Sequence, residues 1–201
     1  AYAEAEIIPR YEHFDRAHGT DHVRTVIAQS LDLARHYDVD ADMIYAVAAY
    51  HDTGLANGRE RHHIDAGRIL AADTELRRWF SEEQIAVMRD AVEDHRASSD
   101  GEPRTIYGRI VAEADRVIDP ATIIRRTVQY GLAHCPELDR EEQYARCLAH
   151  LQQKYAEGGY LRLWIPESDN ARKQEELRAL IRDEARLRAA FDAVFDQETA
   201  R

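Results

Sequence analysis

The sequence lacks the features that mark membrane and secreted proteins. It has no apolar run near the ~20 residues that a membrane-spanning helix needs, and its acidic first six residues do not suggest a signal peptide. Its two cysteines, Cys135 and Cys147, stand outside any CxxC pair, so a disulfide framework cannot form. Isolated thiols are typical of a reducing compartment. We therefore expect a soluble, cytoplasmic protein that has no membrane partner.

The sequence also lacks an excess of positive charge. It has 27 lysine and arginine residues against 38 aspartate and glutamate residues, which gives a net charge of −11. A negative surface repels polyanions, so a nucleic-acid duplex is not expected as a partner. The charge does not exclude a small phosphorylated substrate, because a metal ion and a few arginines can reverse the electrostatic field inside one pocket.

Patterns typical of β-strands are missing as well, and helical periodicity dominates the sequence. The chain is long enough to bury one contiguous core, and we predict a single all-α domain over residues 1–201. Ser81 and Gln84 have the spacing of a capping box. The segment Gly158–Pro166 either covers the mouth of a pocket or packs the last helix onto the domain. The predicted helices cover about 21–37, 40–51, 60–72, 81–96, 105–118, 120–133, 139–156 and 169–195.

Histidine and aspartate gather at the ends and inner faces of these predicted helices. His51 and Asp52 lie at the C-terminal edge of an apolar helix, where burial is expected. Burying an aspartate without a partner is costly, so a bound metal or another partner is needed unless the pair caps the helix in water. Asp115 lies beside an apolar stripe, and either pairs with Arg116 or Arg109 or serves as a metal ligand.

Three segments, taken in order, carry a resemblance to a known family. They are HGTDHVRTV from His18, AAYHDTG around His51 and EADRVID around Asp115, in an otherwise helical chain. This set resembles the HD-domain superfamily of metal-dependent phosphohydrolases. The segments RERHHIDAGRIL and AVEDHRASS resemble the intermediate parts of small bacterial HD hydrolases. The resemblance covers about residues 11–120 and implies a helical bundle of the HD type, followed by a helical extension over about 121–201.

The resemblance implies a divalent-metal site made by His22, His51, Asp52 and Asp115. Imidazole and carboxylate ligands suit Mn, Fe, Ni, Mg, Zn or Co and do not choose among them. A metal in such a site lowers the pKa of a bound water and polarises a phosphoryl group. In the family the aspartate of the His-Asp pair also helps to position that water, so Asp52 is expected to have a catalytic role too.

The resemblance places further histidines around the same pocket. His63 and His95 occupy segments that contribute ligands to a second metal in some HD proteins, or they line the pocket and bind phosphate oxygens. His63 is preferred to His62 because it keeps the HxxxG spacing to Gly67. Asp65 acts as a general acid or base, or it orients His62 as a neighbour of the metal site.

Other residues are candidates for contact with the substrate. His18 is expected in the pocket rather than on the metal, because Gly19 precedes the helix that carries His22. Guanidinium groups suit phosphate oxygens, although a solvated side chain or an ion pair is at least as common for each arginine. The candidate arginines are Arg59, Arg61, Arg96 and Arg116.

The predicted function is hydrolysis of a phosphomonoester or phosphodiester, with a small, nucleotide-like phosphorylated substrate and a metal-activated water. One alternative is a di-iron oxygenase of the HD fold, for which a larger histidine set would speak. Another is a module that binds a nucleotide or metal without turnover, because an intact ligand set does not prove catalysis. The charged C-terminal helix packs either on the domain or across a homodimer.

Overall fold

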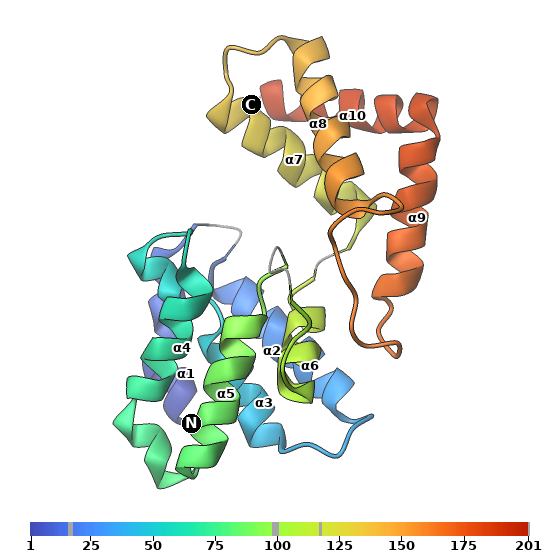
Figure 1. Ribbon diagram of the computed structural model, residues 1–201. Helices are drawn as coiled ribbons and strands as arrows, with labels where there is room; N and C mark the ends of the chain where they lie inside the picture. Colours follow the sequence, from blue (N-terminus) through green and yellow to red (C-terminus); the bar gives the residue numbers. More distant parts are fainter. Residues whose placement is uncertain (16–17, 98–100, 117, 201) are drawn as a thin grey trace. The chain divides into compact units, whose positions relative to one another are not determined.

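The chain is built from α-helices and short 3-10 helices, as the computed structural model in Figure 1 shows. The structure describes residues 1–15, 18–97, 101–116 and 118–200, and these contain no strand, so the predicted all-α class is confirmed. Residues 98–99 and 117 of the segments compared above lie outside the described part. No helix in the described part is both long and apolar enough to cross a membrane. The elements are α1 (Tyr2–Glu6), η1 (Ile8–His13), α2 (Thr20–Ala34), α3 (Ala41–Tyr50), η2 (Thr53–Asn57), α4 (His62–Ala72), η3 (Thr74–Arg78), α5 (Glu82–Asp94), α6 (Ile106–Ala114), α7 (Pro120–His134), α8 (Arg140–Tyr155), α9 (Asn170–Arg182) and α10 (Glu184–Thr199).

The contacts within the chain fall into two compact units. The first unit comprises Ala1–Arg116 and Trp164–Ser168, and the second comprises Val117–Leu163 and Asp169–Arg201. All the motifs singled out in the sequence lie in the first unit, apart from the last residues of the EADRVID segment. That the chain forms one domain over residues 1–201 stays a prediction.

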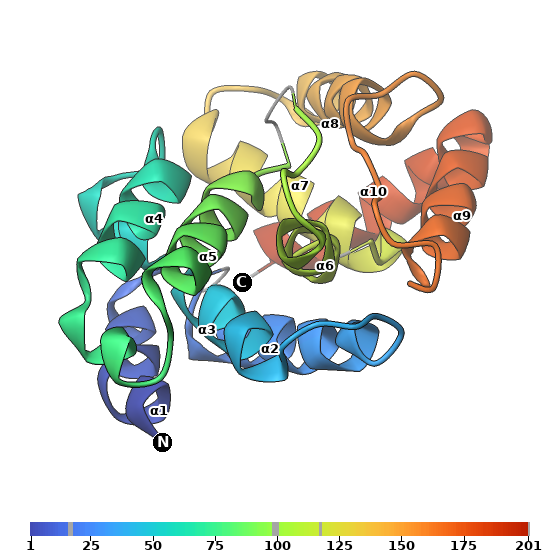
Figure 2. The ribbon, with the colours of Figure 1, turned by 60° about the horizontal axis from the view of Figure 1, so that its bottom comes forward.

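Helix α3 lies at the centre of the first unit because almost every side of it is apolar. It packs against α2, α5 and α6, and Figure 2 shows it between α2 and α5. Asp40 starts the helix, since its side chain accepts hydrogen bonds from the backbone N–H groups of Asp42 and Met43. Seven of its ten residues are buried. The chain therefore leaves α3 inside the unit, and the residues that follow are buried too.

Helices α4 and α5 lie side by side in both views of the ribbon, and two glycines permit the close packing around α4. A Cβ atom on Gly67 would come within 2.7 Å of Glu93 Cγ on α5. A Cβ atom on Gly54 would lie 2.0 Å from the carbonyl oxygen of His62. Gly54 therefore lets the turn after α3 rest directly on the first turn of α4. The capping box predicted at Ser81 and Gln84 is present and starts α5.

The last three residues of the Gly158–Pro166 segment belong to the first unit. Ile165 packs with Ala34, Ile44 and Ile110 in a small apolar cluster. The fully buried carboxylate of Glu113 on α6 accepts hydrogen bonds from the backbone N–H groups of Trp164 and Ile165 and from the hydroxyl of Ser168. This segment therefore covers α6 next to its C-terminal end.

Replacing Glu113 by alanine is expected to destabilise the protein by ~2 kcal/mol or more. The change leaves buried N–H donors without an acceptor, and hydrogen bonds to a charged group are among the stronger ones. Denaturant unfolding of the two proteins measures the difference. The exposed Glu167, which directly follows this segment and accepts a hydrogen bond from Tyr37, is the matched control. Equal losses for Glu113→Ala and Glu167→Ala would contradict the role of the buried carboxylate.

The second unit consists of α7, α8, α9 and α10, which pack on one another. Pro120 stands in the first turn of α7, where its missing N–H costs no helical hydrogen bond. The prediction of one continuous helix over 169–195 is wrong, because the chain breaks at Asp183 between α9 and α10. The Asp183 side chain accepts a hydrogen bond from the N–H of Arg186 and thereby starts a new helix.

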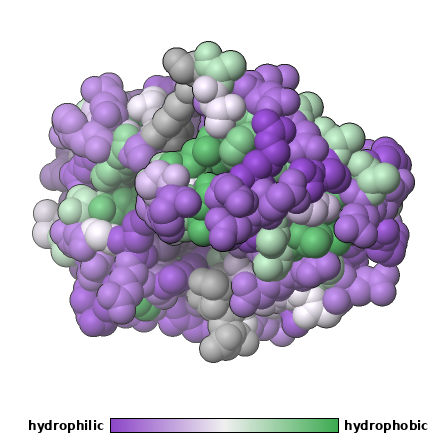
Figure 3. Space-filling view, turned by 90° about the horizontal axis from the view of Figure 1, so that it is seen from above, coloured by the Kyte–Doolittle hydropathy of each residue, from purple (hydrophilic) through white to green (hydrophobic). Residues whose placement is uncertain are grey.

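The face in Figure 3 is mostly hydrophilic, with smaller apolar patches between the polar residues.

Candidate metal centre

The ends of the helices bring the predicted ligands of the first unit together. His51, His95 and Asp115 each follow directly the last residue of a helix, which is α3, α5 and α6 respectively. His22 lies in the first turn of α2, and His62 is the first residue of α4. Three helix C-termini, which carry partial negative charge, therefore converge where a cation would be stabilised.

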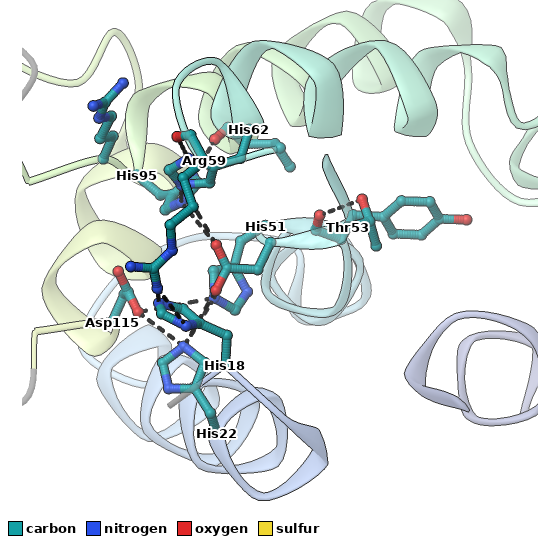
Figure 4. A network of polar contacts seen from close by, with 12 residues as sticks. His18, His22, His51, Thr53, Arg59, His62, His95 and Asp115 are labelled. Carbon is teal, nitrogen blue, oxygen red and sulfur yellow. Dashed lines mark hydrogen bonds and ion pairs between the residues drawn. The ribbon is translucent and has the colours of Figure 1, made fainter. Parts of the chain in front are cut away.

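The first ligand set holds the four residues predicted from the sequence. Nε2 of His22 lies 3.3 Å from Nε2 of His51, 3.2 Å from Oδ1 of Asp115 and 3.5 Å from Oδ2 of Asp52. Nε2 of His51 lies 3.3 Å from Oδ2 of Asp52 and 3.8 Å from Oδ1 of Asp115. Figure 4 shows His22, His51 and Asp115 pointing toward one another from their separate helices. The four side chains that were predicted together from the sequence are therefore neighbours in the fold.

A second ligand set is formed around the other carboxylate oxygen of Asp52, Oδ1. Oδ1 of Asp52 is 3.5 Å from Nε2 of both His62 and His95, and these two nitrogens are 3.3 Å apart. The carboxylate of Asp52 thus stands between the two sets. His62, rather than the predicted His63, takes the position beside His95. The ring of His63 lies 5.6 Å from that of His62, and its Nδ1 is buried without a hydrogen-bond partner.

Backbone carbonyls fix the orientation of three of the imidazole rings. Nδ1–H of His51 donates to the Ala48 carbonyl at 2.7 Å, and Nδ1–H of His95 donates to the Val92 carbonyl at 2.6 Å. His62 makes the same contact with the Arg59 carbonyl at 2.9 Å. Because a carbonyl only accepts, the proton of each neutral ring is on Nδ1, and Nε2 presents a lone pair to the cluster. In α3 and α5 these bonds also satisfy carbonyls of the last turn.

The donor atoms of both sets fit a divalent metal. Nitrogen and oxygen ligands ~2.0–2.2 Å from one metal, at angles of roughly 90–110°, are roughly 2.8–3.6 Å from each other. Four of the five separations given for the first set lie in that range, and only that between His51 and Asp115 is longer. All three separations of the second set lie in it as well. His22, His51 and Asp52 of the first set, and all three members of the second set, therefore lie close enough together to hold a metal ion.

The charges of the cluster also favour a cation. Burial opposes ionisation of Asp52 and Asp115, but His51 and His22 outweigh it and hold the pKa of both carboxyls below their usual range. Burial likewise opposes protonation of His22, but the carboxylates of Asp115 and Asp52 raise its pKa to about 9. For His62, burial and the nearby His95 lower the pKa. The buried carboxylate of Asp52 and the partly buried carboxylate of Asp115 thus need positive charge beside them.

A comparison with known protein families shows to which family the chain is related. The HD domain family matches residues 19–118, which contain every member of both ligand sets. The chain belongs to the HD-domain superfamily. The helical fold of the first unit is consistent with an HD domain, as the sequence predicts. Neither the curated proteins nor the solved structures contain a match to the chain. HD domains bind divalent metals and are generally metal-dependent phosphohydrolases.

Tyr11, which the sequence reasoning did not single out, supports the His-Asp pair of this HD domain. Its fully buried hydroxyl donates to the Ala49 carbonyl at 2.9 Å and accepts from the Asp52 N–H at 3.2 Å. Burial and the nearby Asp52 raise the pKa of Tyr11, so the hydroxyl keeps its proton for the first bond. No motif spacing links η1 to α3, and only a buried polar aromatic in an N-terminal apolar segment hints at such a contact.

Asp65 and His18 are two further residues that the sequence analysis proposed for the site. Asp65 pairs with Arg68 at 3.1 Å on its own helix. Figure 4 shows His18 beside His22, and their ring centroids are 5.8 Å apart. His18 also contacts the side chain of Arg59.

The remaining three candidate arginines differ in their exposure and in their hydrogen-bond partners. Arg61 is exposed. Arg96 donates a hydrogen bond to the Glu60 carbonyl at 2.6 Å. Arg116 is buried and donates to the Ala112 carbonyl on its own helix. Arg96 and Arg116 are thus already bound to backbone carbonyls.

Proposed function

We propose that this HD protein is a phosphohydrolase that cleaves a phosphomonoester or phosphodiester, with a small, nucleotide-like substrate. The position of Asp52 supports the proposal best, because its two carboxylate oxygens face two separate ligand sets. When bound, a divalent metal lowers the pKa of a water molecule and polarises a phosphoryl oxygen. We propose a centre of two metals, and Mn, Fe, Ni, Mg, Zn and Co all suit its nitrogen and oxygen ligands.

The protein's own residues prepare this centre before any substrate arrives. His51, His62 and His95 hold their Nε2 lone pairs toward the cluster through hydrogen bonds to the backbone. Such bonds to the outer ring nitrogen keep a ligand oriented and raise its basicity. With Asp115 the first set has four side chains, whereas the second has three, so the second leaves more room for water and a substrate oxygen.

A small substrate agrees with the charge of the chain. The net charge of −11 opposes binding of a nucleic-acid duplex, whereas the two ligand sets could hold enough positive charge for one phosphate group. A cytoplasmic location, the absence of a membrane partner and a homodimer stay predictions.

The proposal is tested first by metal content and phosphate release. The purified protein is loaded with Mn, Mg, Ni or Fe, its metal is determined by elemental analysis, and it is assayed on phosphate esters and nucleotides. We expect about two metals per chain and metal-dependent phosphate release. His62→Ala should lower the content to about one metal and slow turnover by ~10-fold or more, since it removes one of three ligands of the second set.

His63→Ala is the matched control, because His63 is the neighbour of His62 in sequence and lies outside the second set. It should keep the metal content and most of the activity. The opposite pattern, with metal lost from His63→Ala and kept by His62→Ala, would contradict the assignment of His62. Absence of phosphate release across all metals and esters would contradict the proposed reaction.

The second ligand set also favours the alternative of a di-iron oxygenase. Four histidines and two aspartates, one of which faces both sets, suit two irons as well as two redox-inert metals. Two irons per chain, oxygen consumption and no phosphate release would support this function. Thermal stabilisation by nucleotides without any product would instead support a module that only binds its ligand.

A further inference from the structure

The loop before α4 carries an arginine whose backbone is held in place beside the second ligand set. The carbonyl oxygen of Arg59 accepts the Nδ1–H of His62, and the carbonyl oxygen of the next residue, Glu60, accepts a hydrogen bond from Arg96 at 2.6 Å. Gly58 supplies the positive φ of 103° with which the chain enters the loop. The base of the Arg59 side chain is therefore fixed relative to a proposed metal ligand.

The side chain of Arg59, in contrast, is 62% exposed and bound only at the surface. Its Nη2 lies 3.2 Å from Oδ2 of Asp15 and 3.0 Å from Nδ1 of His18. Asp15 is itself 56% exposed. Figure 4 shows the Arg59 side chain extending from beside His62 toward His18 and Asp115. An ion pair between exposed side chains contributes little, so a better anion is able to displace Asp15.

Arg59 differs in this respect from Arg96 and Arg116, two of the other candidate arginines. Arg96 already binds the Glu60 carbonyl and thereby supports the loop. Arg116 is buried and binds a carbonyl of its own helix. Of these three guanidinium groups, that of Arg59 is held by an exposed carboxylate rather than by the backbone.

We infer that Arg59 binds a phosphate oxygen of the substrate, and that Asp15 holds its guanidinium until the phosphate replaces the carboxylate. A guanidinium forms paired hydrogen bonds with phosphate as readily as with carboxylate. His18, which contacts both Arg59 and Asp15, lies between this ion pair and His22. The inference rests on the proposed function for the identity of the anion, and it assigns Arg59 a positioning role and Asp15 that of an internal competitor.

The test uses inorganic phosphate as the probe. Manganese-loaded full-length protein is titrated with phosphate by isothermal titration calorimetry, and the metal content of every variant is determined in parallel. Arg59→Gln should weaken phosphate binding by about 10–100-fold. Asp15→Asn should instead tighten it by about 2–5-fold, because the competing carboxylate is gone. In the Arg59→Gln background Asp15→Asn should have no effect.

Matched variants separate this role from support of the fold. Arg24 on α2 is also exposed and paired with a carboxylate, that of Glu4 at 3.0 Å, so Arg24→Gln should leave phosphate binding unchanged. Arg59→Lys should restore part of the affinity, since lysine keeps the charge without the paired hydrogen bonds. Equal weakening by Arg59→Gln and Asp15→Asn would overturn the inference, as would unchanged binding in Arg59→Gln.

The same titration distinguishes failure of this inference from failure of the proposed function. Phosphate binding that depends on Arg59, in a protein that hydrolyses no ester, would support the anion site and contradict the hydrolase. Ester hydrolysis with the same KM and the same phosphate affinity in Arg59→Gln would support the hydrolase and contradict the anion site.

Discussion

Replacing Asp52 by alanine is expected to abolish metal-dependent turnover and to remove metal from both ligand sets. One carboxylate oxygen lies within 3.5 Å of His22 and His51, and the other lies 3.5 Å from His62 and His95, so Asp52 offers a ligand atom to each set. Metal polarisation supplies several kcal/mol to such a reaction, and about 4 kcal/mol corresponds to on the order of 10³-fold in rate. We therefore expect kcat/KM to fall by ~10³-fold or more.

Elemental analysis and steady-state kinetics on the same preparation measure both effects. The far-UV circular dichroism should stay helical, because the change removes a carboxylate from the cluster and no apolar core side chain. Asp90→Ala is the matched control, since Asp90 is a partly buried acid of the same unit that pairs with Arg89. Asp52→Ala protein with full metal content and normal turnover would exclude Asp52 as a shared ligand.

Gly54→Ala is expected to have the largest effect on stability. Its Cβ would lie 2.0 Å from the His62 carbonyl oxygen and 2.6 Å from the Ala66 backbone nitrogen, and neither is the flexible end of a side chain. Overpacking typically costs 1–3 kcal/mol, and contact with fixed backbone places this change at about 3 kcal/mol or more. For a chain of this length that is a fall in Tm of roughly 6–12 °C.

The clash also has a consequence for the metal centre, because relief of the strain requires α4 to move away from η2. His62 is the first residue of α4, so we expect the second set to lose affinity for its metal before the first set does. Thermal unfolding and metal titration measure the two effects. Gly101→Ala, where a Cβ meets nothing within 4 Å, should be close to wild type. A stable Gly54→Ala protein with normal metal content would show that η2 and α4 separate easily.

Much of the fold could be predicted because local signals agree with the final structure. The capping residue Ser81 and the first-turn Pro120, together with the apolar stripes, located most of the helices to within a few residues. The four residues of the first ligand set were implied by the resemblance of three short, ordered segments to the HD family, and their side chains lie close together in the structure. Such signals depend on short stretches of sequence alone.

The parts that could not be predicted depend on contacts between distant segments. His62 and His63 are consecutive, so their side chains point about 100° apart on a helix, and spacing to Gly67 does not show which one faces His95. The contact of Gly54 with His62 sets where α4 begins, and that contact is tertiary. The same holds for Tyr11, whose partners at Ala49 and Asp52 are about 40 positions away.

The break at Asp183 was missed for a different reason. The sequence around it is rich in charged residues that are good helix formers, so periodicity runs through the break without interruption. Aspartate at such a position either stays on the exposed side of a continuous helix or caps a new one, and both are compatible with the local sequence. The backbone at Asp183 leaves the helical region, with φ of −96° and ψ of 87°, and the next helix starts there.

The ligands come from distant parts of the sequence, so metal binding also bears on the entropy that the chain loses when it folds. The ligands lie between positions 22 and 115, and both cysteines are free, so in the described chain no covalent cross-link closes these long loops. A metal that binds only the folded chain would act as a removable cross-link, worth ~2.7 kcal/mol at 100 times its dissociation constant. The folded fraction of the first unit would then depend on the free metal concentration. At low metal concentration the protein would lose stability as well as activity.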